Sequence, residues 1–213
     1  MTPALEVSPD AEAAARRVGE LIAERARAGG DFALALSKAP PALLHALVAS
    51  GVPWERVRIF QVDERVVPPG HPDRNLAGLL AALPPRARER VRPLPVDEPD
   101  LEEAAERHAA ALGPLDLVHL GLGPDGHTAS LFPSDPVLDV RDRLVAVTRE
   151  HGGYRRLTLT YPALEAAREL VWLVTGEAKR EALARLLAGD GSIPAARIPN
   201  PRQLVVADAA AAA

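Results

Sequence analysis

Leu115-Asp-Leu-Val-His-Leu-Gly-Leu122 is a short, mainly apolar run that leads directly into Gly123-Pro-Asp-Gly-His-Thr-Ala-Ser-Leu-Phe-Pro133. An apolar run of this length, bounded by turn residues, is typical of a buried strand. Glycine, proline and aspartate at the start of the second segment mark a loop. We therefore predict a core strand over 115–122 with a loop at its carboxyl end.

Similar apolar runs, separated by helical patterns, extend over most of the chain. The runs predict strands at Phe32–Leu36, Val57–Val62, Leu144–Thr148, Leu170–Val174 and Leu204–Val206. The first predicted helix begins with Ser8 as its N-cap and Pro9 in its first turn, and ends at Gly29-Gly30; further helices are predicted at Pro41–Ala49, Asn75–Ala82, Leu101–Leu112 and Glu177–Ala188. This alternation predicts an α/β fold, Rossmann-like and doubly wound, with a mainly parallel sheet and helices on both faces.

Composition narrows the class of protein. The 213 residues contain no internal repeat or linker, so we expect one domain over 1–213, with a frayed tail at 209–213. A net charge of −4 argues against nucleic-acid binding, and the absence of cysteine excludes disulfides, thiolate catalysis and zinc–sulfur sites. The sequence has no signal pattern and no apolar run of ~18–20 residues, so we expect no membrane segment and a cytoplasmic location.

The loop after the predicted core strand offers two interpretations. Gly121, Gly123 and Gly126 match the dinucleotide pattern GxGxxG, which is weak by itself, and Asp125 would repel a pyrophosphate. The other interpretation is catalytic: Asp125 fixes the tautomer of His127, which then acts as a general base. In a purely structural alternative, Asp125 caps a following helix and His127 is an ordinary loop residue.

Charged residues follow the other predicted strands, at the sheet edge where α/β proteins bind ligands. Asp63-Glu-Arg65 follows Val62, Arg155-Arg156 precedes a threonine-rich run, and Lys179 lies near a predicted helix start. Arginine and lysine converging on one ligand suit a phosphate monoester. The alternatives are a solvated ion pair at 63–65, surface charge at the other positions, and Asn75 as a plain N-cap.

Other hydrolase signatures are missing. The chain has no G-x-S-x-G, so Ser130 is not expected as a nucleophile, and no H-E-x-x-H. His45, His108, His119 and His151 show no metal-ligand spacing. His119 lies within the apolar run and is expected to be a satisfied core residue.

Four segments together resemble the 6-phosphogluconolactonase family, over about Leu21 to Asp208. They are Phe60-Gln-Val-Asp-Glu-Arg-Val-Val-Pro68 with His71 and Asn75; Gly121 to Pro133; Arg156-Leu-Thr-Leu-Thr160 with Pro162; and Thr175-Gly-Glu-Ala-Lys179. The related glucosamine-6-phosphate deaminases typically carry Asp-Glu-Tyr and a glutamate-containing segment after Asp-Gly-His. Here Arg65 and Leu131-Phe132-Pro133 occupy those places. This favours the lactonase.

The resemblance implies hydrolysis of 6-phospho-D-glucono-1,5-lactone. It places His127, Asp125 and Asp63 in the catalytic set, with amides around Gly123 and Gly126 facing the oxyanion. Arg65, Arg156 and Lys179 would hold the phosphate, together with Ser37 and Lys38. The partner is a small sugar-phosphate lactone; no cofactor or metal is implied, and we expect a monomer.

One segment departs from the family. After the first predicted strand the family usually has Ser-Gly-Gly-Ser-Thr-Pro, whereas this chain has Ser37-Lys-Ala-Pro-Pro41. Proline removes an amide donor, so this loop has fewer backbone donors for phosphate. Two alternatives stay open: a deaminase or isomerase of the same wider group, and a sugar-phosphate sensor without catalysis.

Overall fold

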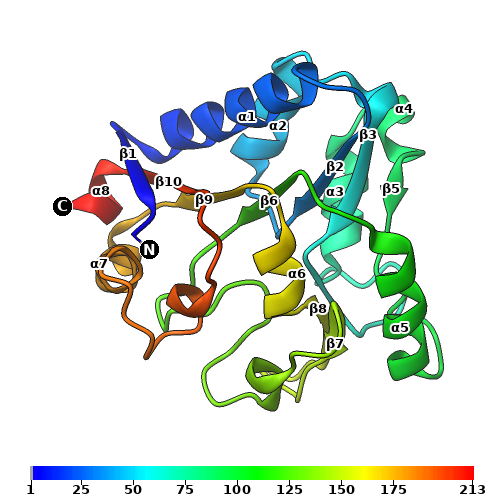
Figure 1. Ribbon diagram of the computed structural model, residues 1–213. Coiled ribbons are helices and arrows are strands. Elements are labelled where there is room, and N and C mark those ends of the chain that lie inside the picture. Colours follow the sequence, from blue (N-terminus) through cyan, green and yellow to red (C-terminus); the bar gives the residue numbers. More distant parts are fainter. Residues whose placement is uncertain (1) are drawn as a thin grey trace.

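The central sheet is built from the apolar runs, and the computed structural model describes it within residues 2–213 (Figure 1). Its order is β1-β10-β9-β6-β2-β3-β5, and every neighbouring pair is parallel. The strands are β1 (Ala4–Ser8), β2 (Phe32–Leu36), β3 (Val57–Gln61), β5 (Val91–Arg92), β6 (Leu117–Leu120), β9 (Leu170–Val174) and β10 (Gln203–Asp208). Strands covered on both faces are apolar throughout, and every residue of β2 and β9 is buried.

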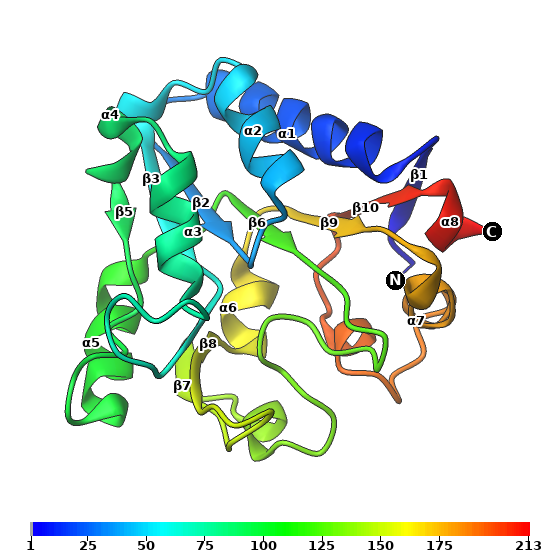
Figure 2. The ribbon, with the colours of Figure 1, turned by 180° about the vertical axis from the view of Figure 1, so that it is seen from behind.

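Helices cover both faces of the sheet, which confirms the predicted α/β fold. On one face lie α1 (Ala11–Arg27), α2 (Pro41–Ala49) and α3 (Asn75–Ala82), and on the other α5 (Leu101–Leu112), α6 (Tyr161–Ala166) and α7 (Arg180–Leu187) (Figures 1 and 2). α1 and α2 approach closely at Gly19, where a Cβ would lie 2.8 Å from Cβ of Ala46.

A second, smaller sheet was not predicted. It is antiparallel, with the order β4-β8-β7, and consists of β4 (Asp63–Arg65), β8 (Arg156–Leu159) and β7 (Val145–Val147). The run predicted as one strand over Val57–Val62 therefore ends at Gln61, and the chain passes through Val62 into a different sheet. The run at Leu144–Thr148 does form a strand, but in this small sheet. The small sheet places Asp63, Arg65 and Arg156 beside the carboxyl ends of the parallel strands.

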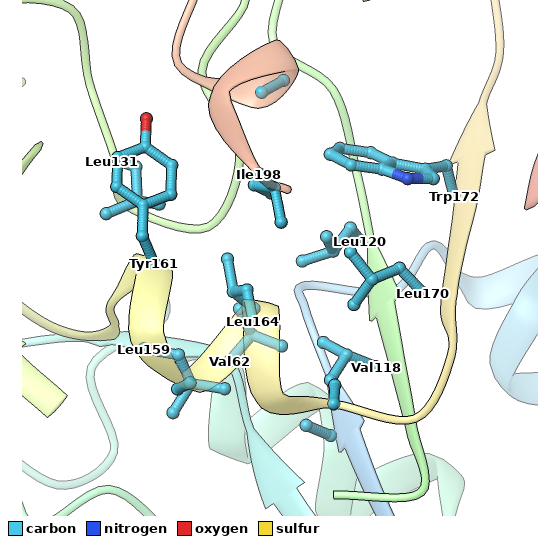
Figure 3. Packing of buried hydrophobic residues seen from close by; sticks show 14 of the residues in the cluster. Val62, Val118, Leu120, Leu131, Leu159, Tyr161, Leu164, Leu170, Trp172 and Ile198 are labelled. Carbon is cyan, nitrogen blue, oxygen red and sulfur yellow. The ribbon is translucent and has the colours of Figure 1, made fainter. Parts of the chain in front are cut away.

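The core between the main sheet and α6 is tightly filled (Figure 3). Trp172, Leu120 and Leu170 of the sheet are fully buried, and they pack with Tyr161 and Leu164 of α6. Burial raises the pKa of Tyr161 to about 12, and its hydroxyl donates a hydrogen bond of 2.9 Å to the carbonyl of Pro194. Each large apolar side chain buried here contributes about 1.5–3 kcal/mol, so this core stabilises the part of the sheet that carries the ligand-binding edge.

The chain ends differ from the prediction. Ser8 is not a helix N-cap: it ends the edge strand β1, and Asp10 caps α1 by accepting from the amide of Ala13 at 2.8 Å. β1 escaped prediction because it is largely exposed and lacks a buried apolar run. At the other end, the tail expected to be frayed forms α8 (Ala209–Ala212), capped by Asp208.

The remaining elements are short. They are α4 (Pro85–Arg88) and 3₁₀ turns at Trp54–Arg56, Pro136–Asp139, Glu177–Lys179 and Ala195–Arg197. The helix predicted over Glu177–Ala188 is therefore a 3₁₀ turn followed by α7. None of the helices formed by residues 2–213 is both long and apolar enough to cross a membrane.

Candidate active site

The loops after β2, β3, β6 and β9 meet at one cavity of about 330 Å³, as predicted from the strand ends. It is lined by Ser37, Lys38, Asp63, Arg65, Asn75, Gly121, Leu122, Gly123, His127, Thr128, Ala129, Ser130, Phe132, Arg156 and Lys179. Of the ten residues predicted for the site, only Asp125 and Gly126 lie outside this lining. We call it the active-site cavity.

Larger cavities exist but carry less chemistry. One of about 880 Å³ lies over α1 and α2 and is lined mainly by alanines and by charged residues of the α1 surface. Another of about 430 Å³ lies between α2 and α3, and its lining is mostly apolar. The active-site cavity is smaller, yet it combines a histidine, a carboxylate and four cationic side chains.

His127 and Asp125 form a direct pair, and no helix follows Asp125 for it to cap. Nδ1 of His127 lies 2.5 Å from Oδ1 of Asp125, and the same oxygen accepts the His127 amide at 3.2 Å. Burial raises the pKa of Asp125, but these hydrogen bonds from His127 outweigh it, and the pKa is lowered overall. The ionised carboxylate favours the tautomer in which Nδ1 carries the hydrogen and donates it to Oδ1 of Asp125, and this leaves Nε2 as the basic nitrogen.

Gly123 and Gly126 are required for the shape of this turn. A Cβ on Gly123 would overlap Nδ1 of His127. Gly126 has a φ of 80°, and a Cβ there would lie 2.5 Å from Cβ of Ile193. Their amides donate within the turn, from Gly123 to the carbonyl of His127 at 2.8 Å and from Gly126 to that of Gly123 at 2.9 Å. Neither of these two amides is therefore free to face an oxyanion in this arrangement.

A second carboxylate, Asp63, lies at the start of β4. Its Oδ2 accepts a hydrogen bond of 2.6 Å from the hydroxyl of Ser130, whose amide is held at 3.1 Å by Oγ1 of Thr158. Burial raises the pKa of Asp63, while the Ser130 hydroxyl and the nearby arginines act in the opposite direction without cancelling the shift. Ser130, excluded as a nucleophile, thus joins the site by orienting a carboxylate.

Glu64, the middle residue of the acidic–acidic–basic triplet, is structural. It is fully buried and accepts from the amides of Arg65, Asn75 and Leu76 at 2.8–2.9 Å and from Nε2 of Gln61 at 2.7 Å. Two of these amides belong to the first turn of α3, so Glu64 takes the place of a helix cap. The N-cap position itself is Arg74, not Asn75.

Arg65 and Arg156 lie directly opposite each other in the β4–β8 ladder. Within residues 2–213, their guanidinium groups donate only to backbone carbonyls, Arg65 to Asp73 and Arg156 to His151 and Tyr154, at 2.6–2.8 Å. Burial lowers the pKa of Arg156, and the charge of Arg65 lowers it further. Like charges opposite each other are destabilising, and an anion between them would remove that repulsion.

Lys179 and Lys38 complete the cationic lining. Burial lowers the pKa of the Lys179 ammonium, and the Asp125 carboxylate acts in the opposite direction. Lys38 follows Ser37, whose amide is already used on the carbonyl of His119 at 3.1 Å. Pro40 and Pro41 start α2 without amide hydrogens. Among these residues Lys38 contributes a positive charge to the cavity lining that can attract an anion.

Two aromatic or imidazole groups were not understood from the sequence. Phe132 lies with its ring centroid 4.6 Å from that of His127 and 3.8 Å from that of His151, and it limits the motion of the His127 ring. His119 is buried as predicted, but it is not satisfied: neither ring nitrogen has a hydrogen-bond partner within residues 2–213. In the sequence, the position of Phe132 next to the glycine loop was the only sign that its ring would contact His127. The absence of a partner for His119 among the described residues could be seen only in the structure.

Among the residues that the structure describes, no group of three or more histidine, aspartate and glutamate side chains is arranged to hold a metal ion. Three of the other histidines lie on separate elements: His45 is on α2, His108 on α5 and His119 on β6.

A protein-family model for glucosamine-6-phosphate isomerases/6-phosphogluconolactonase matches residues 9–207. The chain is 39% identical over 188 residues to a 6-phosphogluconolactonase of Synechocystis, covering 81% of this chain and 76% of the relative. It is 37% identical to a 6-phosphogluconolactonase of Nostoc, and this match covers 100% of this chain and 98% of the relative.

Solved structures agree on the fold. A 6-phosphogluconolactonase from Thermotoga maritima superposes with a TM-score of 0.84 at 27% identity, covering 97% of this chain and 99% of that one. A monomeric glucosamine-6-phosphate deaminase, 18% identical, has a TM-score of 0.85 and covers 98% of both chains, which shows that the two branches share one architecture. The chain belongs to the glucosamine-6-phosphate isomerase/6-phosphogluconolactonase family.

Proposed function

We propose that this protein hydrolyses 6-phospho-D-glucono-1,5-lactone to 6-phosphogluconate, the second step of the oxidative pentose phosphate pathway. One observation carries the proposal: His127, which is paired with Asp125, lines the same cavity as two arginines and two lysines. A base that activates water, close to cations that hold a phosphate, is what a phosphorylated lactone requires. The 6-phosphogluconolactonases among the relatives support the same substrate.

In the proposed reaction, Nε2 of His127 removes a proton from a water molecule as its oxygen attacks the lactone carbonyl carbon. The bond between that carbon and the ring oxygen then breaks, and the ring oxygen takes the proton back from His127 and becomes a hydroxyl. Asp125 stabilises the imidazolium between these transfers. Asp63, oriented by Ser130, accepts a hydrogen bond from a sugar hydroxyl.

The phosphate end is assigned to the cations. Arg65 and Arg156 present adjacent guanidinium groups from one ladder, and Lys179 and Lys38 approach from the loops after β9 and β2. Charge-assisted hydrogen bonds of this kind are about twice as strong as neutral ones. In the His127 turn, Gly123 leaves room for the imidazole and Gly126 for Ile193, and the amides of both glycines donate inside the turn, so neither is assigned to the carbonyl oxygen.

The deciding assay measures lactone hydrolysis by the pure protein against spontaneous ring opening, with glucosamine 6-phosphate as the control substrate. We expect turnover of the lactone and no release of ammonia. Ammonia release would favour the deaminase branch. Binding of 6-phosphogluconate with no rate above the spontaneous one would make the protein a sensor and overturn the proposal.

His127 is tested separately. Replacing His127→Ala removes the general base, and kcat should fall by ~10²–10⁴ while binding of 6-phosphogluconate is retained. His45→Ala is the control, because His45 is exposed on α2 and outside the active-site cavity. A kcat within a few-fold of the unmodified protein would exclude His127 as the base.

A further inference from the structure

His119 is a buried imidazole with no assigned task. Its side chain is 1% exposed, and both ring nitrogens lack a hydrogen-bond partner within residues 2–213. Buried polar groups are almost always paired, because an unpaired one loses its interaction with water without replacement. The nitrogens of His119 therefore need a partner that is not part of the protein.

The fold places this ring under the segment Ser37–Pro41. In β6, His119 is registered with Leu36 of β2 and Val171 of β9, and both of these belong to the core below α1 and α2. The carbonyl of His119 holds the amide of Ser37 at 3.1 Å. The imidazole thus lies on the side of the sheet where α2 begins.

His119 is among the residues that line a cavity of about 340 Å³ next to the active-site cavity. Its other lining residues are Lys38, Ala39, Pro40, Pro41, Gly121, Leu173 and Thr175. Lys38 and Gly121 belong to both linings, so the two cavities adjoin at these residues. The polar side chains of the smaller space are a lysine, a threonine and His119, a set suited to an anion.

Burial lowers the pKa of His119 to about 4, so the imidazole is neutral near pH 7. A neutral imidazole carries one N–H donor and one acceptor. The segment above it has lost donors: Pro40 and Pro41 occupy the start of α2 and carry no amide hydrogen. His119 supplies a donor on the same side of the cavity.

We propose that His119 donates a hydrogen bond to the phosphate group of the substrate, beside the ammonium of Lys38, and so replaces backbone donors that this loop lacks. The inference rests on the proposed function for the identity of the phosphate. Phosphate has several acceptor oxygens, and in this arrangement His119 and Lys38 bind on the β2–α2 side while the arginines bind on the side of the small sheet.

The main test replaces His119→Leu and compares two substrates. KM for the phosphorylated lactone should rise about 10-fold to 100-fold, the worth of one hydrogen bond to a charged group, with kcat nearly unchanged. KM for unphosphorylated gluconolactone should not change. His119→Gln, which keeps an N–H donor, should recover part of the loss. Equal effects on both substrates, or none, would overturn the proposal.

His108→Leu is the matched control. It removes a half-buried imidazole whose Nε2 is buried and unpaired within residues 2–213, but on α5, packed edge-on against Phe60 and outside both cavities. KM should be unaffected. If His119 is only an unpaired core group, His119→Leu will raise the melting temperature and leave KM unchanged, which also overturns the proposal.

A binding measurement separates this inference from the proposed function. In ¹⁵N-histidine-labelled protein, inorganic phosphate and 6-phosphogluconate should each shift the His119 ring resonances, whether or not the lactone is turned over. Unshifted His119 resonances at saturating 6-phosphogluconate would reject the contact, even in an active enzyme. Shifted resonances in a protein without turnover would retain it and reject the hydrolase.

Discussion

At the scale of single residues, the polar groups of the site differ in whether the protein already pairs them. Glu64 is fully paired, by three amides and a glutamine, and has no capacity left for a ligand. Arg65 and Arg156 lie side by side and donate only to carbonyls within residues 2–213. Adjacent residues of one triplet, Glu64 and Arg65, therefore have opposite tasks, one structural and one assigned to the ligand.

Lys179 offers the clearest test of phosphate binding, because its side chain makes no hydrogen bond within residues 2–213 whose loss would disturb the fold. Lys179→Ala should raise KM for the phosphorylated lactone by about 10-fold to 100-fold, since a bond to a charged group is lost. KM for gluconolactone should stay the same. The neighbouring Arg180→Ala, which removes a surface pair with Glu177 and a long, exposed hydrogen bond of 3.4 Å to the carbonyl of Ala210, serves as the control. Equal changes for both substrates would remove Lys179 from the phosphate site.

Gly123 tests the close approach in the His127 turn. In Gly123→Ala the new methyl group would overlap Nδ1 of His127 and Oδ1 of Asp125, so the pair must separate. We expect kcat to fall by ~10² or more, as expected when a positioned base is displaced, with the far-ultraviolet circular dichroism unchanged. Gly30→Ala is the control, because its Cβ would meet nothing within 4 Å. If Gly123→Ala kept its activity, the close contact between His127 and Asp125 would not be required for catalysis.

At the scale of elements, the small sheet decides where the carboxylate and the arginines lie. β3 ends at Gln61, and after one residue the chain enters β4, which pairs with β8 about ninety residues further on. This change of sheet turns Asp63 and Arg65 toward the carboxyl ends of β6 and β9. Glu64 then connects β4 to α3 by accepting the amides of Asn75 and Leu76.

The hydrogen bonds by which Glu64 connects β4 to α3 should contribute strongly to the free energy of unfolding. Glu64→Gln puts an amide group where the carboxylate accepts four donors, and it should lower the free energy of unfolding by about 1–3 kcal/mol for each donor left unpaired. Hydrogen exchange of the α3 amides should accelerate. Glu20→Gln on the exposed face of α1 should change stability by no more than about 0.5 kcal/mol. Unchanged urea denaturation in Glu64→Gln would contradict the assigned role.

At the scale of the whole molecule, two cores on opposite faces of one sheet share the buried strands. His119 lies between them as a polar group in an apolar layer, and this affects global stability. Burial lowers the pKa of His119 to about 4, whereas the same side chain in the unfolded chain has a pKa near 6.5. Between these two pH values the unfolded chain therefore binds a proton that the folded protein does not bind. The free energy of unfolding is therefore unaffected by the protonation of His119 above pH 6.5, and it decreases as the pH falls from 6.5 toward 4.

This linkage predicts a difference between two denaturation series. The free energy of unfolding by urea is measured without phosphate from pH 7 to pH 4 for the unmodified protein and for His119→Leu. As the pH falls, it should decrease more for the unmodified protein, by roughly 1–3 kcal/mol, at about 1.4 kcal/mol per pKa unit. The carboxylates contribute equally to both series and cancel in the difference. Parallel curves would show that the His119 imidazole is not held neutral by the fold.

Local sequence was enough to predict several features. Continuous apolar runs predicted the core strands β2, β6 and β9, because strands buried on both faces need apolar side chains at every position. Alternation with helices predicted the parallel sheet, and the ends of its strands predicted the loops that line the cavity. Asp125 and His127 could be paired from sequence because they are two residues apart, within reach of one turn.

Tertiary structure alone decided the rest, since it depends on groups far apart in the chain. The pairing of Arg65 with Arg156 depends on a strand register between distant segments, which periodicity does not encode. Whether a buried polar group is satisfied depends on its neighbours in space: Glu64 found four donors, while His119 in an equally buried strand found none within residues 2–213. The direction of the Gly123 and Gly126 amides depends likewise on turn closure, which uses both of them inside the loop.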